Sequence, residues 1–280
     1  MTGRTARKTP RAARARLDAE LVRRGLARSR EQAAELIAAG RVTVNGEAAA
    51  KAATQVTRDT PVVVGAADGD PGYVSRGGHK LAGALAAFGD LTVAGRICLD
   101  AGASTGGFTD VLLRAGAASV IAVDVGYGQL AWSLQTDPRV TVLDRVNVRS
   151  LEPAQVATAE GRLPDLVVGD LSFISLSLVL PALVASADEH ADFVLMVKPQ
   201  FEVGKGRVGA GGVVRDPGLR ADAVAAVART AAELGLGVCG VTASPLPGPA
   251  GNVEYFVWLR RGAPPLDDRD LRRAIAEGPH

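Results

Sequence analysis

The sequence predicts an α/β fold in which a doubly wound parallel sheet follows a small basic α+β unit. Apolar, strand-like runs alternate with Ala-rich amphipathic segments five or six times after residue 72, which is typical of a parallel sheet covered by helices. The chain has 280 residues, 47% of them hydrophobic, which allows one sizeable core and a small appended domain. Residues 1–60 contain thirteen Lys and Arg against six Asp and Glu, whereas the remainder contains nineteen against twenty-four.

This charge split indicates a polyanion-binding segment joined to an enzyme-like body, with a basic solvated tail as the simpler alternative. Cys98 and Cys239 each lie in an apolar stretch, so we expect packing residues rather than a disulfide, and we expect no metal. The longest weakly polar stretch, residues 174–187, is interrupted by Pro181 and is too short to span a bilayer. The start lacks the apolar core of a signal peptide, so we expect a cytoplasmic protein without a membrane partner.

The N-terminal region divides into an arm and a small folded unit. Residues 1–15 carry five Lys and Arg, no acid and almost no large apolar side chain, which predicts a disordered basic arm. Residues 16–65 are predicted to form the α+β unit. Apolar residues at helical spacing predict a first helix from Leu17, which Gly25 ends. Ser29 has the form of a helix cap and opens a second helix.

A hairpin should complete this unit. Residues 41–44 alternate and run into Asn45-Gly46, the pair favoured in a two-residue β-hairpin turn. Residues 62–64 are apolar and can add a closing strand.

Three pieces of the unit resemble the S4-type RNA-binding domain in their order and spacing: residues 16–18, 26–30 and 40–46. The resemblance covers about fifty residues. It implies that an arginine-rich face docks on structured RNA, with contacts from Arg16, Arg28, Arg30 and Arg41. Arginine suits this role because its planar fork engages a phosphate through two hydrogen bonds. Each of these arginines, taken alone, is equally well explained as a solvated surface charge.

A polar, Gly-rich linker is predicted at residues 66–72. We expect the larger domain to occupy residues 73–262 and a C-terminal tail to occupy residues 263–280. Its strands are predicted at seven apolar runs, residues 96–100, 120–124, 140–143, 166–170, 193–197, 237–242 and 253–260.

A candidate cofactor loop follows the first of these strands. Residues 97–108 end the strand in a glycine-rich turn that leads into a helix, a geometry that lets the backbone approach a ligand. Asp124 ends the second strand, where an acid hydrogen-bonds ribose hydroxyls in nucleotide-type sites. A simple strand-end cap is the alternative for Asp124.

The spacing of the loop differs from the dinucleotide fingerprint and resembles the acid-x-Gly-x-x-x-Gly loop of class I, Rossmann-like methyltransferases. That resemblance implies S-adenosyl-L-methionine as the cofactor, with a NAD-type site as the alternative. It also implies that Asp100 helps to hold the amino-acid end and that Asn147 lies beside the adenine, although a plain turn would explain Asn147 nearly as well. The remaining expected cofactor contacts are Gly102, Ser104, Thr105, Gly106, Gly107, Phe108 and Asp124.

Lysine usage points to the chemistry. The chain has 27 arginines but only five lysines. Where arginine is so strongly preferred, a lysine in a structured site indicates a role in proton transfer, because arginine cannot readily lose a proton. Lys198 follows an apolar strand, so its amine should emerge at the carboxyl edge of the sheet, and Lys80 belongs to a helix that leads into the core. Asp170 ends one strand and Glu254 begins the last.

In this order the four residues match the Lys-Asp-Lys-Glu tetrad of 2′-O-methyltransferases with this fold. The chain resembles the TlyA-type, or haemolysin A-like, ribosomal RNA cytidine 2′-O-methyltransferases, in which an S4 domain precedes an FtsJ-like methyltransferase domain. The resemblance implies methylation of cytidine ribose in small- and large-subunit ribosomal RNA, with ribosomal subunits as partners. Some members carry an Arg and paired tryptophans in the linker, and this chain does not. The matching segments are residues 75–81, 102–110, 124–130, 170–175 and 197–202.

The expected mechanism places Lys198 against the 2′-oxygen, where it favours the alkoxide. Asp170 would orient that amine, Lys80 would add positive charge, and Glu254 would position Lys80 or the ribose. A neighbouring cation favours the neutral amine and the carboxylates favour the ammonium, and the sequence leaves this balance open.

Residues 205–212 predict a mobile basic loop in which Lys205 and Arg207 grip RNA phosphates, with a plain surface loop as the alternative. Two other functions stay open. One is a non-catalytic RNA-binding assembly factor that retains a cofactor pocket. The other, a pore-forming haemolysin, is disfavoured because the sequence offers neither a spanning segment nor a strongly amphipathic, lipid-seeking helix.

Overall fold

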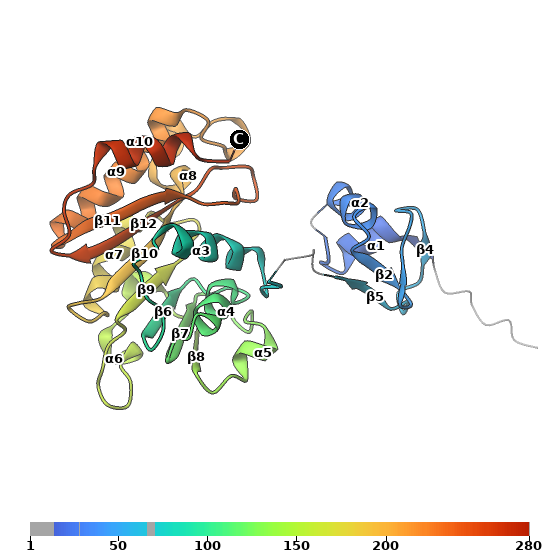
Figure 1. Cartoon of the computed structure of the whole chain (residues 1–280), viewed down its shortest axis with the longest axis horizontal. Helices are drawn as coiled ribbons and strands as arrows, with labels where there is room; N and C mark the ends of the chain where they lie inside the picture. The colour runs from blue at the N-terminus through green and yellow to red at the C-terminus, as the bar shows by residue number, and fades with distance from the viewer. Residues whose placement is uncertain (1–13, 28, 66–70, 280) are drawn as a thin grey trace, which may run out of the picture. The chain divides into compact units, whose positions relative to one another are not determined.

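The computed structural model describes residues 14–27, 29–65 and 71–279, and the chain divides between Gly72 and Tyr73 into two compact units (Figure 1). Most of the predicted arm and of the predicted linker lies outside the described residues, as does Arg28. None of the described helices is long and apolar enough to cross a membrane.

The smaller unit packs two helices against short strands. Helices α1 (Leu17–Arg23) and α2 (Arg30–Ala38) bury Leu17 and Leu21 completely. Ser29 caps α2 by accepting a hydrogen bond from the Gln32 amide at 3.1 Å, so the predicted cap is confirmed. The strands pair antiparallel in two sets, β1 (Ala15–Arg16) with β4 (Gln55–Val56), and β2 (Val42–Val44) with β3 (Glu47–Ala48) and β5 (Val62–Val64).

The predicted hairpin is present. Val44 pairs with Glu47, which leaves Asn45 and Gly46 as the two-residue turn. Their φ angles are +52° and +85°, and a turn with two left-handed residues is the reason that Asn-Gly is favoured there.

The larger unit is built on a seven-stranded sheet with the strand order β11-β12-β10-β9-β6-β7-β8. Neighbouring strands from β10 through β9, β6 and β7 to β8 pair in parallel, as the sequence predicts. The exception is β12, which runs antiparallel to both β10 and β11 because it returns from β11 as a hairpin. The strands are β6 (Ile97–Ala101), β7 (Ser119–Asp124), β8 (Val140–Asp144), β9 (Leu166–Gly169), β10 (Asp192–Val197), β11 (Leu236–Ala243) and β12 (Tyr255–Arg261).

Helices cover both faces of this sheet (Figure 1). Alternate residues along each strand point to opposite faces, so Cys98 joins one apolar cluster while its neighbours Ile97 and Leu99 join the other. One face carries α3 (Arg76–Ala87), α4 (Gly107–Arg114) and α5 (Trp132–Gln135), and the other carries α7 (Leu176–Ala185), α9 (Pro217–Glu233) and α10 (Asp268–Ala276). Short helices α6 (Pro153–Val156) and α8 (Pro199–Glu202) complete the unit.

Helix α10 lies within residues 263–280, which we expected to form a C-terminal tail. Its Leu271 and Ala274 are buried in the same apolar cluster as residues of α7, α9 and the sheet. Cys98 is buried and Cys239 is half-buried, and both thiols are free.

The antiparallel direction of β12 has a consequence for one edge of the sheet. The parallel strands β7, β9 and β10 place Asp124, Asp170 and Lys198 at their carboxyl ends. Because β12 runs the other way, its amino end reaches the same edge, where Val197 pairs with Tyr255. Glu254, immediately before β12, therefore lies at that edge too.

Candidate functional site

Two lysine–carboxylate pairs lie at this edge. Lys198 Nζ is 2.6 Å from Asp170 Oδ1, and Lys80 Nζ donates a short hydrogen bond to Glu254 Oε2. Only 6% of Lys80, 8% of Lys198 and 1% of Glu254 is exposed. A buried charge is costly unless it is paired, so each lysine can remain here only with its carboxylate. The four residues of the predicted tetrad are thus brought together as two adjacent ion pairs.

Lys198 is held by two residues that follow β9. Its Nζ donates to Ser172 Oγ at 2.7 Å as well as pairing with Asp170. A lysine ammonium has three donors, so one remains for a ligand when these two are satisfied. Ser172 was not identified from the sequence, because nothing distinguishes it from any other loop serine.

Lys80 reaches the edge because α3 and α4 approach each other closely. A Cβ atom on Gly107 would lie 2.3 Å from Ser75 Oγ and 2.7 Å from the Gly78 amide nitrogen, so only glycine fits at the start of α4. This contact brings the first turns of α3 beside the glycine-rich loop. Gly107 therefore allows the close approach that places Lys80 at this edge.

Two cavities meet between these residues. The smaller, about 240 Å³, is lined by the tetrad residues Lys80, Asp170 and Lys198 together with Ser172, and by the predicted loop residues Gly102, Ser104, Thr105, Gly107 and Phe108. Glu254 does not line it and contacts it only through Lys80.

The larger cavity, about 490 Å³, is lined by Asp124 and Asn147, both predicted, and by Gln129, which was not. Gly102, Ser104, Asp170 and Ser172 line both cavities. The two cavities therefore adjoin each other at these four residues, next to Lys198.

Asp124 fixes the glycine-rich loop. Its Oδ2 accepts a hydrogen bond from the Ser104 amide at 2.8 Å and its Oδ1 accepts one from the Gly126 amide at 2.7 Å. Ser104 has a φ of +48°, a left-handed conformation that this bond helps to hold. Each carboxylate oxygen keeps a second lone pair for a ligand hydroxyl.

Gly102 and Gly106 supply the turn itself, with φ angles of +85° and +96°. A Cβ atom on Gly102 would come within 3.0 Å of the Asp170 carbonyl oxygen, and one on Gly106 within 2.2 Å of Leu134. Gly106 thus shapes the loop from behind, since it lines neither cavity.

Asp100 is withdrawn from both cavities. It is completely buried, and its Oδ2 accepts a hydrogen bond from Thr109 Oγ1 at 2.7 Å, while Oδ1 has no hydrogen-bond partner among the described residues. Burial raises the pKa of this carboxyl group to about 7. Its side chain lines neither cavity, so the structure gives no support to the predicted contact with the amino-acid end of a cofactor.

Asn147 lines the larger cavity. Its Oδ1 accepts a hydrogen bond from the Arg149 amide at 3.0 Å and caps the turn Val148–Ser150. The side chain amide nitrogen remains available to the cavity.

Phe173 was missed by the sequence analysis. Its side chain is 91% exposed on the wall of the larger cavity, and its ring centroid lies 5.3 Å from that of Phe201. Its φ of +64° is unfavourable for a bulky residue, and such strain is concentrated at functional sites. A local φ of this sign depends on the loop's tertiary contacts and leaves no signal in sequence.

The smaller unit presents arginines that are held by buried acids. Asp18, 4% exposed, accepts two hydrogen bonds from Arg16 at 2.9 and 3.1 Å and two from Arg30 at 3.0 and 3.3 Å. The hydrogen bonds from Arg16, and to a smaller extent those from Arg30, hold the pKa of Asp18 well below its usual value. Since the side chains of Arg16 and Arg30 are 47% and 59% exposed, they keep donors free for an external anion.

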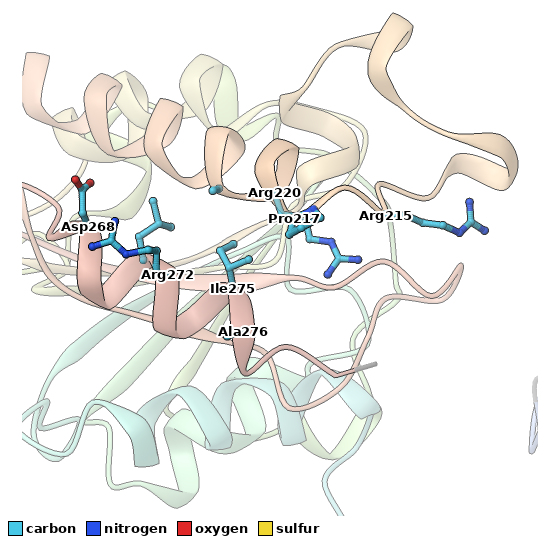
Figure 2. Close-up of a pocket in the computed structure, with 9 residues that line it drawn as sticks. Arg215, Pro217, Arg220, Asp268, Arg272, Ile275 and Ala276 are labelled. Carbon is cyan, nitrogen blue, oxygen red and sulfur yellow. The ribbon is translucent and has the colours of Figure 1, made fainter.

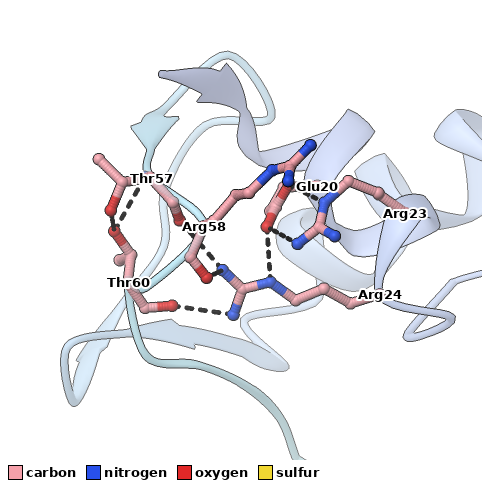
Figure 3. Close-up of polar contacts among 6 residues, drawn as sticks. All are labelled: Glu20, Arg23, Arg24, Thr57, Arg58 and Thr60. Atoms are coloured by element: carbon pink, nitrogen blue, oxygen red, sulfur yellow. Dashed lines mark hydrogen bonds and ion pairs between the residues drawn. The ribbon is translucent and has the colours of Figure 1, made fainter. Parts of the chain in front are cut away.

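Glu20 organises a second pair of arginines (Figure 3). It accepts hydrogen bonds from Arg23 at 2.6 and 2.7 Å and from Arg24 at 2.8 Å, and these groups lower the pKa of Glu20 to about 2. Arg24 also donates to the carbonyl oxygens of Thr57, Arg58 and Thr60. Arg24 therefore stabilises the fold through these bonds, whereas Arg23 bonds only Glu20 among the described residues. The sequence does not distinguish the two arginines.

The remaining predicted RNA contacts are less organised. Arg41 Nε donates to the Gly65 carbonyl oxygen at 3.0 Å, and Arg207 Nε donates to the Val203 carbonyl oxygen at 2.8 Å. The Lys205 side chain and the whole of Arg28 lie outside the described residues.

Comparison with known proteins identifies the family. The S4 domain model matches residues 15–62, and the FtsJ-like methyltransferase model matches residues 73–261. The Mycobacterium tuberculosis 16S/23S rRNA (cytidine-2′-O)-methyltransferase TlyA is 63% identical over 96% of this chain and 100% of its own length. The chain belongs to the TlyA family of FtsJ-like methyltransferases. The resemblance inferred from the sequence motifs is thus confirmed, as are the fold class and the presence of an S4 domain.

Two further relatives extend the comparison. Hemolysin A of Brachyspira hyodysenteriae is 37% identical over 86% of this chain and 98% of its own length. A solved structure from Streptococcus thermophilus, designated a candidate hemolysin, superposes with a TM-score of 0.76 at 38% identity and covers 94% of this chain and 95% of its own.

Membership of this family makes S-adenosyl-L-methionine the cofactor, as the loop spacing predicts. The site fits that molecule. The larger cavity has the size of a small-molecule site, and Asp124 on its wall retains acceptor capacity for ribose hydroxyls. Gly102 lines both cavities, and a side chain there would meet the Asp170 carbonyl oxygen, so glycine lets the loop approach the strand end that carries Asp170.

Asp124→Asn should weaken S-adenosyl-L-methionine binding by roughly ten- to a hundredfold, because an amide cannot accept both backbone hydrogen bonds and the ribose hydroxyls together. Isothermal titration measures this. Asp144→Asn is the matched control: Asp144 pairs with Asp124 in register, ends β8 and accepts a hydrogen bond from the Gly128 amide at 2.9 Å, but lines neither cavity. Equal affinities for the two variants would contradict the assignment.

Asp100→Asn should change how stability depends on pH. In the folded protein Asp100 has a pKa of about 7, above its unfolded value, so the folded state holds a proton that the unfolded state releases. Wild-type stability should therefore fall relative to the variant as pH rises from about 4 to 7, by about 1.4 kcal/mol per unit. Urea unfolding at several pH values tests this, and parallel curves for the two proteins would refute it.

Proposed function

We propose that this chain transfers the methyl group of S-adenosyl-L-methionine to the 2′-hydroxyl of cytidine ribose in ribosomal RNA. The observation that carries the proposal is the pairing of the buried Lys198 with Asp170, where the two cavities adjoin. The M. tuberculosis relative, which this chain matches over its entire length, is named for this reaction on 16S and 23S RNA. We therefore assign RNA of both ribosomal subunits as substrate and the cytoplasm as the place of action.

The chemistry requires a weakly acidic alcohol to become a nucleophile. When bound, S-adenosyl-L-methionine supplies a methyl group on a positively charged sulfur. In its neutral form Lys198 Nζ takes the proton of the 2′-hydroxyl and becomes the ammonium, which Asp170 and Ser172, at 2.6 and 2.7 Å, hold in place. Lys80 adds positive charge on the same cavity wall and favours the developing oxyanion. Glu254 is a positioning residue, since it acts by holding Lys80.

Lys198→Arg should lower the rate of methyl transfer by at least about a hundredfold, because arginine keeps the charge but cannot accept the proton. A tritium-transfer assay on ribosomal subunits measures the rate, and titration should show unchanged cofactor affinity. Lys51→Arg, at an exposed position of the smaller unit, is the control for a lysine-to-arginine change. Normal turnover by the Lys198 variant would exclude its role.

The same assay separates the alternative of a non-catalytic assembly factor. If the wild-type chain binds both S-adenosyl-L-methionine and ribosomal subunits but transfers no tritium to either subunit, the enzyme assignment fails and the binding function remains.

Residues 16–65 are proposed as the RNA-binding domain and residues 73–262 as the catalytic domain. In the first, Arg16 and Arg30 are proposed as phosphate contacts, because Asp18 orients them while about half of each side chain stays exposed. The exposed ring of Phe173 is proposed to stack on a base at the mouth of the larger cavity.

Arg30→Ala should affect RNA binding, whereas Arg24→Ala should affect the stability of the fold. The first should weaken binding to ribosomal RNA and reduce its salt dependence, while leaving the melting temperature nearly unchanged. The second should lower the stability of the smaller unit, because Arg24 bonds Glu20 and three backbone carbonyls. Salt-dependent RNA affinity and thermal unfolding test the pair, and an Arg30 variant with unchanged RNA affinity would remove it from the interface.

A further inference from the structure

A third cavity lies away from the lysines, between the first turns of α9 and helix α10 (Figure 2). Its volume is about 700 Å³, larger than either cavity described above. Part of its lining is apolar, with Leu271 and Ile275 on α10 and Pro217 on α9, and Arg220 and Ile275 point into it from opposite helices. A large space lined by apolar side chains and a few charged groups is a usual form of ligand site.

The charged groups of this cavity are mainly arginines. Arg215, Arg220 and Arg272 line it against a single acid, Asp268, so its lining is net positive. Arg220 is held in place, because its Nε donates to the Val214 carbonyl oxygen at 2.9 Å. Arg272 is exposed and has no ion pair or hydrogen bond among the described residues. Arg215 Nη1 donates to the Ala210 carbonyl oxygen at 3.3 Å. The cavity therefore combines two guanidinium groups that are bonded to the backbone with that of Arg272, which can adjust to an anion.

A buried polar group adjoins the same arginine. Tyr255 is fully buried, and its hydroxyl has no hydrogen-bond partner that meets normal geometry among the described residues. Burial raises the pKa of this phenol, and Arg220 opposes that change through both its charge and a side-chain interaction with the hydroxyl. Tyr255 does not line the cavity, so its hydroxyl bears on the cavity only through Arg220.

The cavity is bonded to the catalytic strand. The carbonyl oxygen of Val214 accepts the bond from Arg220, and its amide donates to Asn252 Oδ1 at 2.9 Å. Asn252 Nδ2 in turn donates to the Gly212 carbonyl oxygen at 2.9 Å. Asn252 is 3% exposed and lies two residues before Glu254. One rim of the cavity is thus continuous with the loop and the strand that flank the lysines.

We propose that this cavity binds one nucleotide unit of the RNA substrate, remote from the methylated one. The arginines engage its phosphate through their planar forks, and the apolar side chains accept the ribose or the base. RNA is favoured over a free ligand because the cavity adjoins the substrate edge through Val214 and Asn252. The inference rests on the proposed function, since it takes ribosomal RNA as the substrate.

The test compares Arg272→Glu with Arg269→Glu, an exposed arginine on the same helix that does not line the cavity. In tritium transfer to ribosomal subunits, Arg272→Glu should raise KM at least about fivefold and leave kcat near the wild-type value, because the contact is remote from the reacting atoms. The slope of log affinity against log salt should fall in magnitude by about 0.7 to 0.9 for one lost phosphate contact. The Arg269 variant should stay close to wild type, and thermal unfolding should show both variants folded.

Other outcomes overturn the proposal. Equal KM values and salt slopes for the two variants would show that the cavity does not touch the RNA. Titration with inorganic phosphate and with cytidine monophosphate should give at most weak, millimolar binding, whereas micromolar, Arg272-dependent binding with an unchanged RNA KM would assign the cavity to a free nucleotide. A wild-type chain that methylates no ribosomal RNA would instead refute the proposed function, so the two failures are distinguishable.

Discussion

Two buried lysines, each neutralised by one carboxylate, are the interaction on which the larger unit depends. Transfer of an ammonium group from water to a protein interior costs several kcal/mol, and it is tolerated only with close compensation. Asp170 and Ser172 compensate Lys198, and Glu254 compensates Lys80. These partners come from separate segments of the chain, so the sheet must assemble before either lysine can be buried without a large penalty.

The topology of the sheet meets this requirement through one antiparallel strand. In a wholly parallel sheet the residue before the last strand would lie at the opposite edge, far from the lysines. Because β12 is reversed between β10 and β11, Glu254 lies beside the carboxyl end of β10 instead. The hairpin that makes the fold differ from a purely parallel sheet is thus the feature that completes the site.

The sequence predicts those parts of the site that depend on local pattern. Strand ends placed Asp170 and Lys198, and the Asn45-Gly46 pair predicted its turn, because side-chain period and turn chemistry are local properties. Contacts chosen by tertiary packing were not predictable. The burial of Asp100 and the exposure of Phe173 depend on how neighbouring loops close, which no nearby residue specifies.

The neutrality of the tetrad also explains why the chain needs binding groups elsewhere. Two lysines and two carboxylates present almost no net charge to a polyanion, and residues 61–280 carry nineteen basic against twenty-four acidic residues. In the proposed function, the affinity for RNA comes from localised arginines that their acids orient but leave partly exposed, such as Arg16 and Arg30 beside Asp18. Binding energy gained far from the reacting ribose can then hold that ribose against Lys198, where the buried site itself offers little attraction.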